Sequence, residues 1–199
     1  MPLSLEAAFT ELRSLRREDR ERDLSSHIEA MLRQHWPEDD ARVLRGELIG
    51  ELHRHDRLVE AESLLRAEIE REPSEPFHSL ALAEHFHYYD VNLSESLSHV
   101  AQAIVKAATD GKFMYQALGV QARLAIEAQD WPLLEATLVK LATYEHVPGN
   151  ADVFPETDFV SRIPAGAVAE EALTSYLARV EHLRSISYST LHGPRNLSP

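Results

Sequence analysis

The sequence predicts an all-α protein assembled from helix pairs, and three observations support this prediction. Apolar residues recur three and four residues apart along almost the whole chain, which is the spacing of one helix face. No segment of comparable length alternates apolar and polar residues as a half-buried strand does. The predicted first residues of successive second helices, Leu24, Leu58, Leu93 and Trp131, lie 34, 35 and 38 residues apart. That period is typical of a helical solenoid, in which each pair buries its apolar side by stacking on the next.

The apolar faces define nine helices. In chain order their apolar residues are Leu5, Phe9 and Leu12; Leu24, Ile28 and Met31; Leu44, Leu48 and Leu52; Leu58, Ala61, Leu65 and Ile69; Leu82, Ala83 and Phe86; Leu93, Leu97, Val100 and Ile104; Leu118, Ala122 and Ala125; Leu134, Leu138 and Leu141; Leu173, Tyr176, Val180 and Leu183. We expect one domain, 1–188, with helix pairs at about 4–38, 40–75, 76–110 and 112–145, a loop at 145–167, a capping helix at 166–187 and a flexible tail at 189–199. Both tryptophans, Trp36 and Trp131, stand near helix ends and are expected to pack in the core or as caps.

The second helix of each pair is preceded by the same kind of residue. Asp23, Asp56, Asn92 and Asp130 stand at or just before these helix starts. An Asp or Asn side chain accepts a hydrogen bond from an N–H group that the first helical turn leaves unpaired. We therefore predict these four residues as helix N-caps.

Two histidine-rich stretches raise the question of a metal site, HRHD at 53–56 and HFHYYD at 85–90. Residues two apart on a helix point about 200° away from each other, so neither histidine pair can hold one ion while helical. Neither stretch has the four-residue spacing of a helical zinc site. HRHD is better explained as the end of one helix and the turn into the next.

Residues 42–75 carry a recognisable packing pattern. Leu48, Leu52, Leu58, Ala61, Leu65 and Pro73 occupy the large, large, large, Ala, large and Pro positions of the tetratricopeptide repeat. This segment resembles that repeat closely in spacing, while 4–38, 76–110 and 115–148 resemble it more loosely, and the turn within 76–110 is longer by one residue. The resemblance implies a right-handed array of helical hairpins whose first helices line a concave groove. The groove residues that it implies are Gly50, His53, Arg54, Glu84, His87, Tyr88 and Arg123.

The charge of the chain restricts its partners. A formal net charge of −13 is repelled by nucleic acid and by anionic membranes and favours a basic partner. The arginines between 13 and 22 alternate with acids, which is typical of a solvated helix face and not of a basic patch. No segment approaches eighteen consecutive apolar residues and cysteine is absent, so we expect a soluble, cytoplasmic protein without a disulfide or thiolate metal site.

These observations predict a non-enzymatic module that binds a protein or peptide, with no cofactor, no metal and no catalytic residues. Sequence motifs of phosphate-binding loops, dinucleotide sites and serine hydrolases are absent. Two alternatives remain open. One is a small acidic inhibitor, immunity protein or chaperone that neutralises a single partner. The other is a metal-dependent enzyme in which His53, His87 and Glu84 converge on one ion.

The connection at 145–167 contains three prolines and is longer than most loops of compact domains. We expect it to pack against the helices through its apolar residues. These are Val153, Phe154, Phe159 and Val160.

Overall fold

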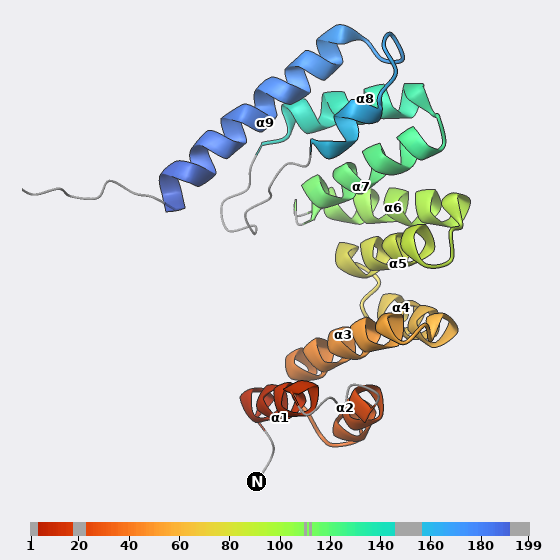
Figure 1. The fold of residues 1–199 in the computed structure, drawn as a ribbon, viewed down its shortest axis with the longest axis vertical. Coiled ribbons are helices and arrows are strands. Elements are labelled where there is room, and N and C mark those ends of the chain that lie inside the picture. The colour runs from red at the N-terminus through yellow and green to blue at the C-terminus, as the bar shows by residue number, and fades with distance from the viewer. Residues whose placement is uncertain (1–3, 18–22, 110, 112, 146–156, 192–199) are drawn as a thin grey trace, which may run out of the picture. The chain divides into compact units, whose positions relative to one another are not determined.

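The computed structural model describes residues 4–17, 23–109, 111, 113–145 and 157–191, and every regular element within these ranges is a helix (Figure 1). The prediction of an all-α protein is therefore confirmed. The elements are α1 (Leu5–Arg17), α2 (Leu24–Leu32), α3 (Glu38–Arg54), α4 (Leu58–Arg71), α5 (Pro76–Tyr88), α6 (Leu93–Ala107), α7 (Met114–Glu127), α8 (Trp131–Thr143), the short 3₁₀ helix η2 (Asp158–Arg162) and α9 (Glu170–Leu191). The chain divides into two compact units, 1–71 and 72–199.

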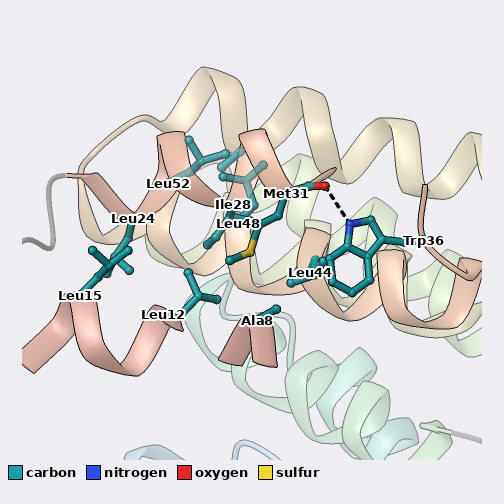
Figure 2. Packing of buried hydrophobic residues seen from close by; sticks show 11 residues of the cluster. Ala8, Leu12, Leu15, Leu24, Ile28, Met31, Trp36, Leu44, Leu48 and Leu52 are labelled. Carbon is teal, nitrogen blue, oxygen red and sulfur yellow. Dashed lines mark hydrogen bonds between the residues drawn. The ribbon is translucent and has the colours of Figure 1, made fainter. Parts of the chain in front are cut away.

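The first unit packs α1 to α4 around one apolar cluster, which Figure 2 shows from close by. The cluster includes Leu12, Leu24, Leu44, Leu48 and Leu52 from the apolar faces predicted for the first three helices, Ala61 of α4, and Trp36 from the connection between α2 and α3. Trp36 is 9% exposed, and its indole Nε1 donates a hydrogen bond to the carbonyl oxygen of Met31 at 2.7 Å (Figure 2). This bond closes the connection over the core, so the predicted packing role of Trp36 is confirmed.

In the second unit, α5 to α9 pack against their neighbours in chain order. One apolar cluster lies between α5, α6 and α7, and a second lies between α7, α8, α9 and η2. Phe159 of η2 is 1% exposed and stacks on Tyr176 of α9, with ring centroids 5.8 Å apart. Trp131 lies half-buried against the second cluster at the first position of α8.

The turns inside the pairs α3/α4 and α7/α8 have the same backbone geometry. Asp56 and Gln129 adopt the left-handed conformation, with φ of 57° and 54°. The N–H of the next residue, Arg57 or Asp130, donates to the carbonyl five residues back at 2.9 and 2.8 Å. This pattern is the Schellman motif, which satisfies the last carbonyls of the first helix of the pair.

The turn between α5 and α6 is one residue longer, as the sequence predicts. Val91 has φ of 51°, and Asn92 N–H donates to a carbonyl six residues back at 2.8 Å. The side chains of Asn92 and Asp130 then accept hydrogen bonds from N–H groups of α6 and α8 at 3.2 and 3.0 Å. These two predicted N-caps are confirmed.

The other two predicted N-caps are wrong. Asp23 makes no side-chain cap hydrogen bond to α2. Asp56 belongs to the turn, and Arg57 stands where Asn92 and Asp130 stand in the other pairs. An arginine side chain has no acceptor and cannot cap the helix. Arg57 instead donates hydrogen bonds to Ser25 of α2 at 2.7 Å and to Glu60 of α4 at 2.6 Å.

The C-terminal helix differs from its predicted bounds. α9 begins at Glu170 instead of 166 and continues to Leu191, so residues 189–191 are helical where a tail was predicted. Phe159 packs as expected, whereas Val153 and Phe154 lie outside the described residues, as does 192–199.

Candidate partner-binding face

The predicted groove residues are distributed over both units. Gly50, His53 and Arg54 belong to α3 in the first unit, Glu84, His87 and Tyr88 to α5 in the second, and Arg123 to α7. The surroundings of each group are described within its own unit.

In the first unit, Arg54 pairs with a buried carboxylate. Glu51 is 1% exposed, accepts from Arg16 of α1 at 2.8 Å, and also accepts from Arg54. Gly50 lies beside the same guanidinium, because a Cβ added there would lie 3.8 Å from Arg54 Nη2. Arg16 therefore joins α1 to α3 through Glu51, and Arg54 adds a second partner for this carboxylate from α3 itself. His53 is half-buried on the same helix.

A second buried carboxylate follows the same plan. Glu68 of α4 is 2% exposed and pairs with Arg71 three residues later on its own helix. Arg45 of α3 approaches it from another helix, with Nε 2.6 Å from Glu68 Oε1. Sequence reasoning missed both buried carboxylates, because the spacing of a Glu and an Arg three residues further on also occurs at the exposed Glu181.

In the second unit, His87 bridges α5 and α7. Its Nε2 lies 2.9 Å from Glu127 Oε2, and the side chain is 11% exposed. Arg162 of η2 lies 3.5 Å from the other oxygen of Glu127, so the connection after α8 also reaches this cluster. The ring of Tyr88 packs on His87 with centroids 4.3 Å apart.

Glu84 lies one helical turn before His87 and Tyr88 on α5, and α7 is packed beside that helix. Burial raises the pKa of the Glu84 carboxyl, and the nearby charges of Arg123 and His87 oppose this rise. The structure thus brings together four of the predicted residues: Glu84, His87, Tyr88 and Arg123. Sequence reasoning missed the acid that joins the two helices, Glu127.

Large apolar side chains are exposed at the end of α5. Tyr88 is 55% exposed, Tyr89 44% and Val91 81%, and they are nearly consecutive in the chain. Exposed aromatic residues next to a fixed polar cluster are typical of protein-binding surfaces. We refer to Glu84, His87, Tyr88, Arg123 and Glu127 together as the α5–α7 face.

Two further observations concern groups that could bind a metal ion or act as a nucleophile. Within the described part of the chain, no group of three His, Asp or Glu side chains is placed to hold a metal ion. Lys106 Nζ donates to Ser79 Oγ at 2.7 Å, and burial lowers the pKa of Lys106. Although serine and lysine form a catalytic pair in some enzymes, Ser79 is 0% exposed, so its hydroxyl is inaccessible and the contact instead joins α5 to α6.

Comparison with protein-family models, curated protein sequences and solved structures finds no match for this chain. Among the helices that the structure describes, none combines the length and the apolar character that crossing a bilayer requires.

Proposed function

We propose that the protein is a non-enzymatic interaction module that binds a basic protein or peptide through the α5–α7 face. The observation that carries the proposal is Tyr88, an aromatic ring that is 55% exposed and packed on a histidine that is itself held by a neighbouring helix. A side chain held in this way loses little conformational entropy on binding, and for that reason such residues dominate the energetics of many interfaces.

The chemistry of the face favours a basic residue in the partner. The face of a tyrosine ring attracts Arg and Lys side chains through cation–π interactions. Glu127 contacts His87, on which the Tyr88 ring packs, so a carboxylate lies close to this ring. The formal net charge of −13 steers a cationic partner towards the protein. The partner residue that we expect on Tyr88 is therefore an arginine or a lysine.

We also propose an architecture that resembles the tetratricopeptide repeat. In this architecture, α1 to α8 form four degenerate hairpins of a right-handed solenoid, and α9 caps the last hairpin. Two features support this arrangement: the 34- to 38-residue interval between second helices, and the related turns within α3/α4, α5/α6 and α7/α8.

Selection from a random peptide library on the immobilised protein tests the proposal. We expect enriched peptides to contain Arg or Lys, and we expect Tyr88→Ala to weaken their binding about tenfold or more, as loss of a hot-spot aromatic does. Val105→Ala is the matched control, because Val105 is 73% exposed on α6 of the same unit. Enrichment of peptides without basic residues, or equal loss in both variants, contradicts the proposal.

A capture experiment distinguishes this function from that of an acidic inhibitor or chaperone. Several weak ligands that share a short basic motif indicate an adaptor. One tight partner whose binding falls steeply with added salt indicates an inhibitor.

A further inference from the structure

A depression of about 390 Å³ lies in the first unit, where the connection between α2 and α3 meets α3 and α4. Its walls are Leu32, Gln34, His35, Trp36, Glu38, Ala41, Arg45, Leu64 and Arg71. The volume lies in the range of small-molecule sites, about 300–1,000 Å³. This depression is formed by the first unit alone, so it is independent of the α5–α7 face.

One side of the depression is apolar. Leu32, Ala41 and Leu64 are partly buried against the core of the unit, and Trp36 lies among them. The indole N–H of Trp36 is already donated to the Met31 carbonyl. The wall at Trp36 therefore offers a ligand carbon surface and no free donor.

The depression is also lined by two arginines, Arg45 and Arg71. The side chain of Arg45 is 9% exposed, and its Nη2 donates to Glu38 Oε1 at 2.6 Å. Its Nε, although close to Glu68 Oε1, is not aligned to donate to it and has no hydrogen-bond partner among the described residues. Two arginines and one carboxylate line the depression, and Glu68 lies behind them, so the four charges balance. If Glu38 moves out to solvent, one positive charge is left for a ligand.

The two carboxylates next to Arg45 differ in how firmly they are held. Glu68 is 2% exposed and lies behind Arg45, whereas Glu38 is 63% exposed and stands at the rim as the first residue of α3. Glu38 Oε1 is also 4.0 Å from Arg71 Nε. Solvent can take up the Glu38 carboxylate at little cost, so an incoming carboxylate can replace it on Arg45 without leaving a buried charge unpaired.

We propose that this depression binds a small-molecule carboxylate with an apolar ring, whose charge is held by Arg45 and Arg71 after Glu38 is displaced. The ring covers Trp36 and Leu64, and the carboxylate takes the place of the Glu38 side chain. Glu38 thereby acts as a competitor for the site.

Titration with 3-phenylpropanoate and with the uncharged 3-phenylpropanamide, followed by backbone amide NMR of the full chain, tests this proposal. We expect the carboxylate to shift amide signals around Trp36 and Arg45, and the amide to bind at least about tenfold more weakly, because hydrogen bonds to charged groups are the stronger ones. Equal affinity for the two compounds, or shifts elsewhere only, overturns the proposal.

Substitution of Glu38 distinguishes competition with the ligand for Arg45 from a purely structural role of Glu38. Glu38→Gln is expected to tighten binding of 3-phenylpropanoate about threefold or more, because the neutral amide competes less well for Arg45. Asp39→Asn is the matched control, since Asp39 is the next residue, is 90% exposed, pairs with Arg42 and does not line the depression. If both variants tighten binding equally, the effect is one of overall charge and the proposal is wrong.

Substitution of the arginines completes the test. Arg45→Gln leaves Glu68 buried with one partner and can unfold the unit, so Arg71→Gln is the safer variant because Arg71 is 43% exposed. We expect Arg71→Gln to weaken binding of 3-phenylpropanoate several-fold with an unchanged amide spectrum elsewhere. Unchanged affinity in Arg71→Gln overturns the assignment of the site.

Discussion

In both units, helices that are adjacent in the chain pack against each other, but the two units join their helices by different polar contacts. In the first unit, Glu51 and Glu68 are each buried between arginines of two helices. In the second unit, the His87–Glu127 pair is more exposed, with Glu127 at 32%, and neutral groups join helices in the interior, as when Ser96 Oγ donates to the Ala83 carbonyl at 2.7 Å. Thr137 Oγ1 likewise lies 3.0 Å from Gln121 Oε1.

The two units also differ in which cationic residues they contain. Every lysine of the chain lies in the second unit, at 106, 112 and 140, whereas every cationic side chain in 1–71, histidine aside, is arginine. Arginine remains charged when buried and offers several donors in a fixed plane, so it can serve a buried carboxylate that lysine would leave partly unpaired. An interior with ion pairs therefore favours arginine, whereas a neutral interior leaves the choice of cation free.

The largest expected effect comes from the apolar contact that holds η2 in the second unit. Phe159→Ala is expected to cost about 3–5 kcal/mol, because it removes a fully buried ring that stacks on Tyr176. Amide hydrogen exchange measures the result, with faster exchange expected in 72–191. An equal increase in 23–71 contradicts the view that the two units are separate compact bodies.

The second effect concerns the ion pairs of the first unit. Arg45→Met is expected to cost about 3 kcal/mol, because it leaves the buried Glu68 with Arg71 as its remaining partner. Adding Glu68→Leu is expected to recover most of the loss, since an apolar pair needs no charge compensation. Urea unfolding of the single and double variants measures both values, and a double variant that is less stable than Arg45→Met refutes this explanation.

The turns provide a third comparison, because three residues other than glycine have positive φ at equivalent places. Glycine adopts this conformation without strain, so Val91→Gly is expected to stabilise the protein by about 1 kcal/mol, since a β-branched residue is strained most there. Gln129→Gly should gain less, and Asp56→Gly least, because Asp tolerates this region. Thermal unfolding gives the order, and a loss of stability in Val91→Gly contradicts it.

The smallest expected effect concerns two glutamates, Glu51 and Glu84, whose ionised side chains affect the stability of the protein in opposite directions. Burial opposes ionisation of Glu51, but hydrogen bonds from Arg16 and Arg54 outweigh it and hold the pKa of Glu51 below its ordinary value. The stability that Glu51 contributes is therefore present above its unfolded pKa and is lost as the pH falls through its folded pKa. Burial raises the pKa of Glu84, so stability is greatest when this group is protonated and falls as the pH rises through its raised pKa.

Glu51→Gln should therefore destabilise the protein at pH 7 and Glu84→Gln should stabilise it, each by roughly 0.5–1 kcal/mol. Both differences in stability from the unsubstituted protein should shrink in acid. For Glu51→Gln the difference should vanish below the folded pKa of Glu51, and for Glu84→Gln it should vanish below the ordinary pKa of a glutamate. Urea unfolding between pH 3 and 7 measures them. The same sign for both variants at pH 7 contradicts the assigned environments.

Much of the fold could be predicted because each helix has an apolar face. Leu44, Leu48 and Leu52 are buried as expected, and so are Leu134, Leu138 and Leu141. The geometry of the turns was hidden, since Val91 and Gln129 are not residues that favour positive φ. The surrounding hydrogen bonds impose that conformation, and no local signal marks it.

The polar interior was the least predictable part. Arg16 belongs to a run of alternating charges that predicts local pairs on a solvated helix face, yet it pairs with Glu47 and Glu51 of α3. Which acid is buried depends on the tertiary packing of the helices. In the α5–α7 face, four predicted residues come together because α5 packs beside α7. Glu127 was missed because nothing in its local sequence differs from a surface acid.

Each unit contains one of the two tryptophans, with Trp36 enclosed in the first and Trp131 half-buried in the second. Replacing either indole by phenylalanine leaves a single tryptophan, whose fluorescence can be excited apart from that of the tyrosines and reports on one half of the chain. The molecule thus carries its own pair of optical probes, and the order in which its halves melt can be followed without any added dye.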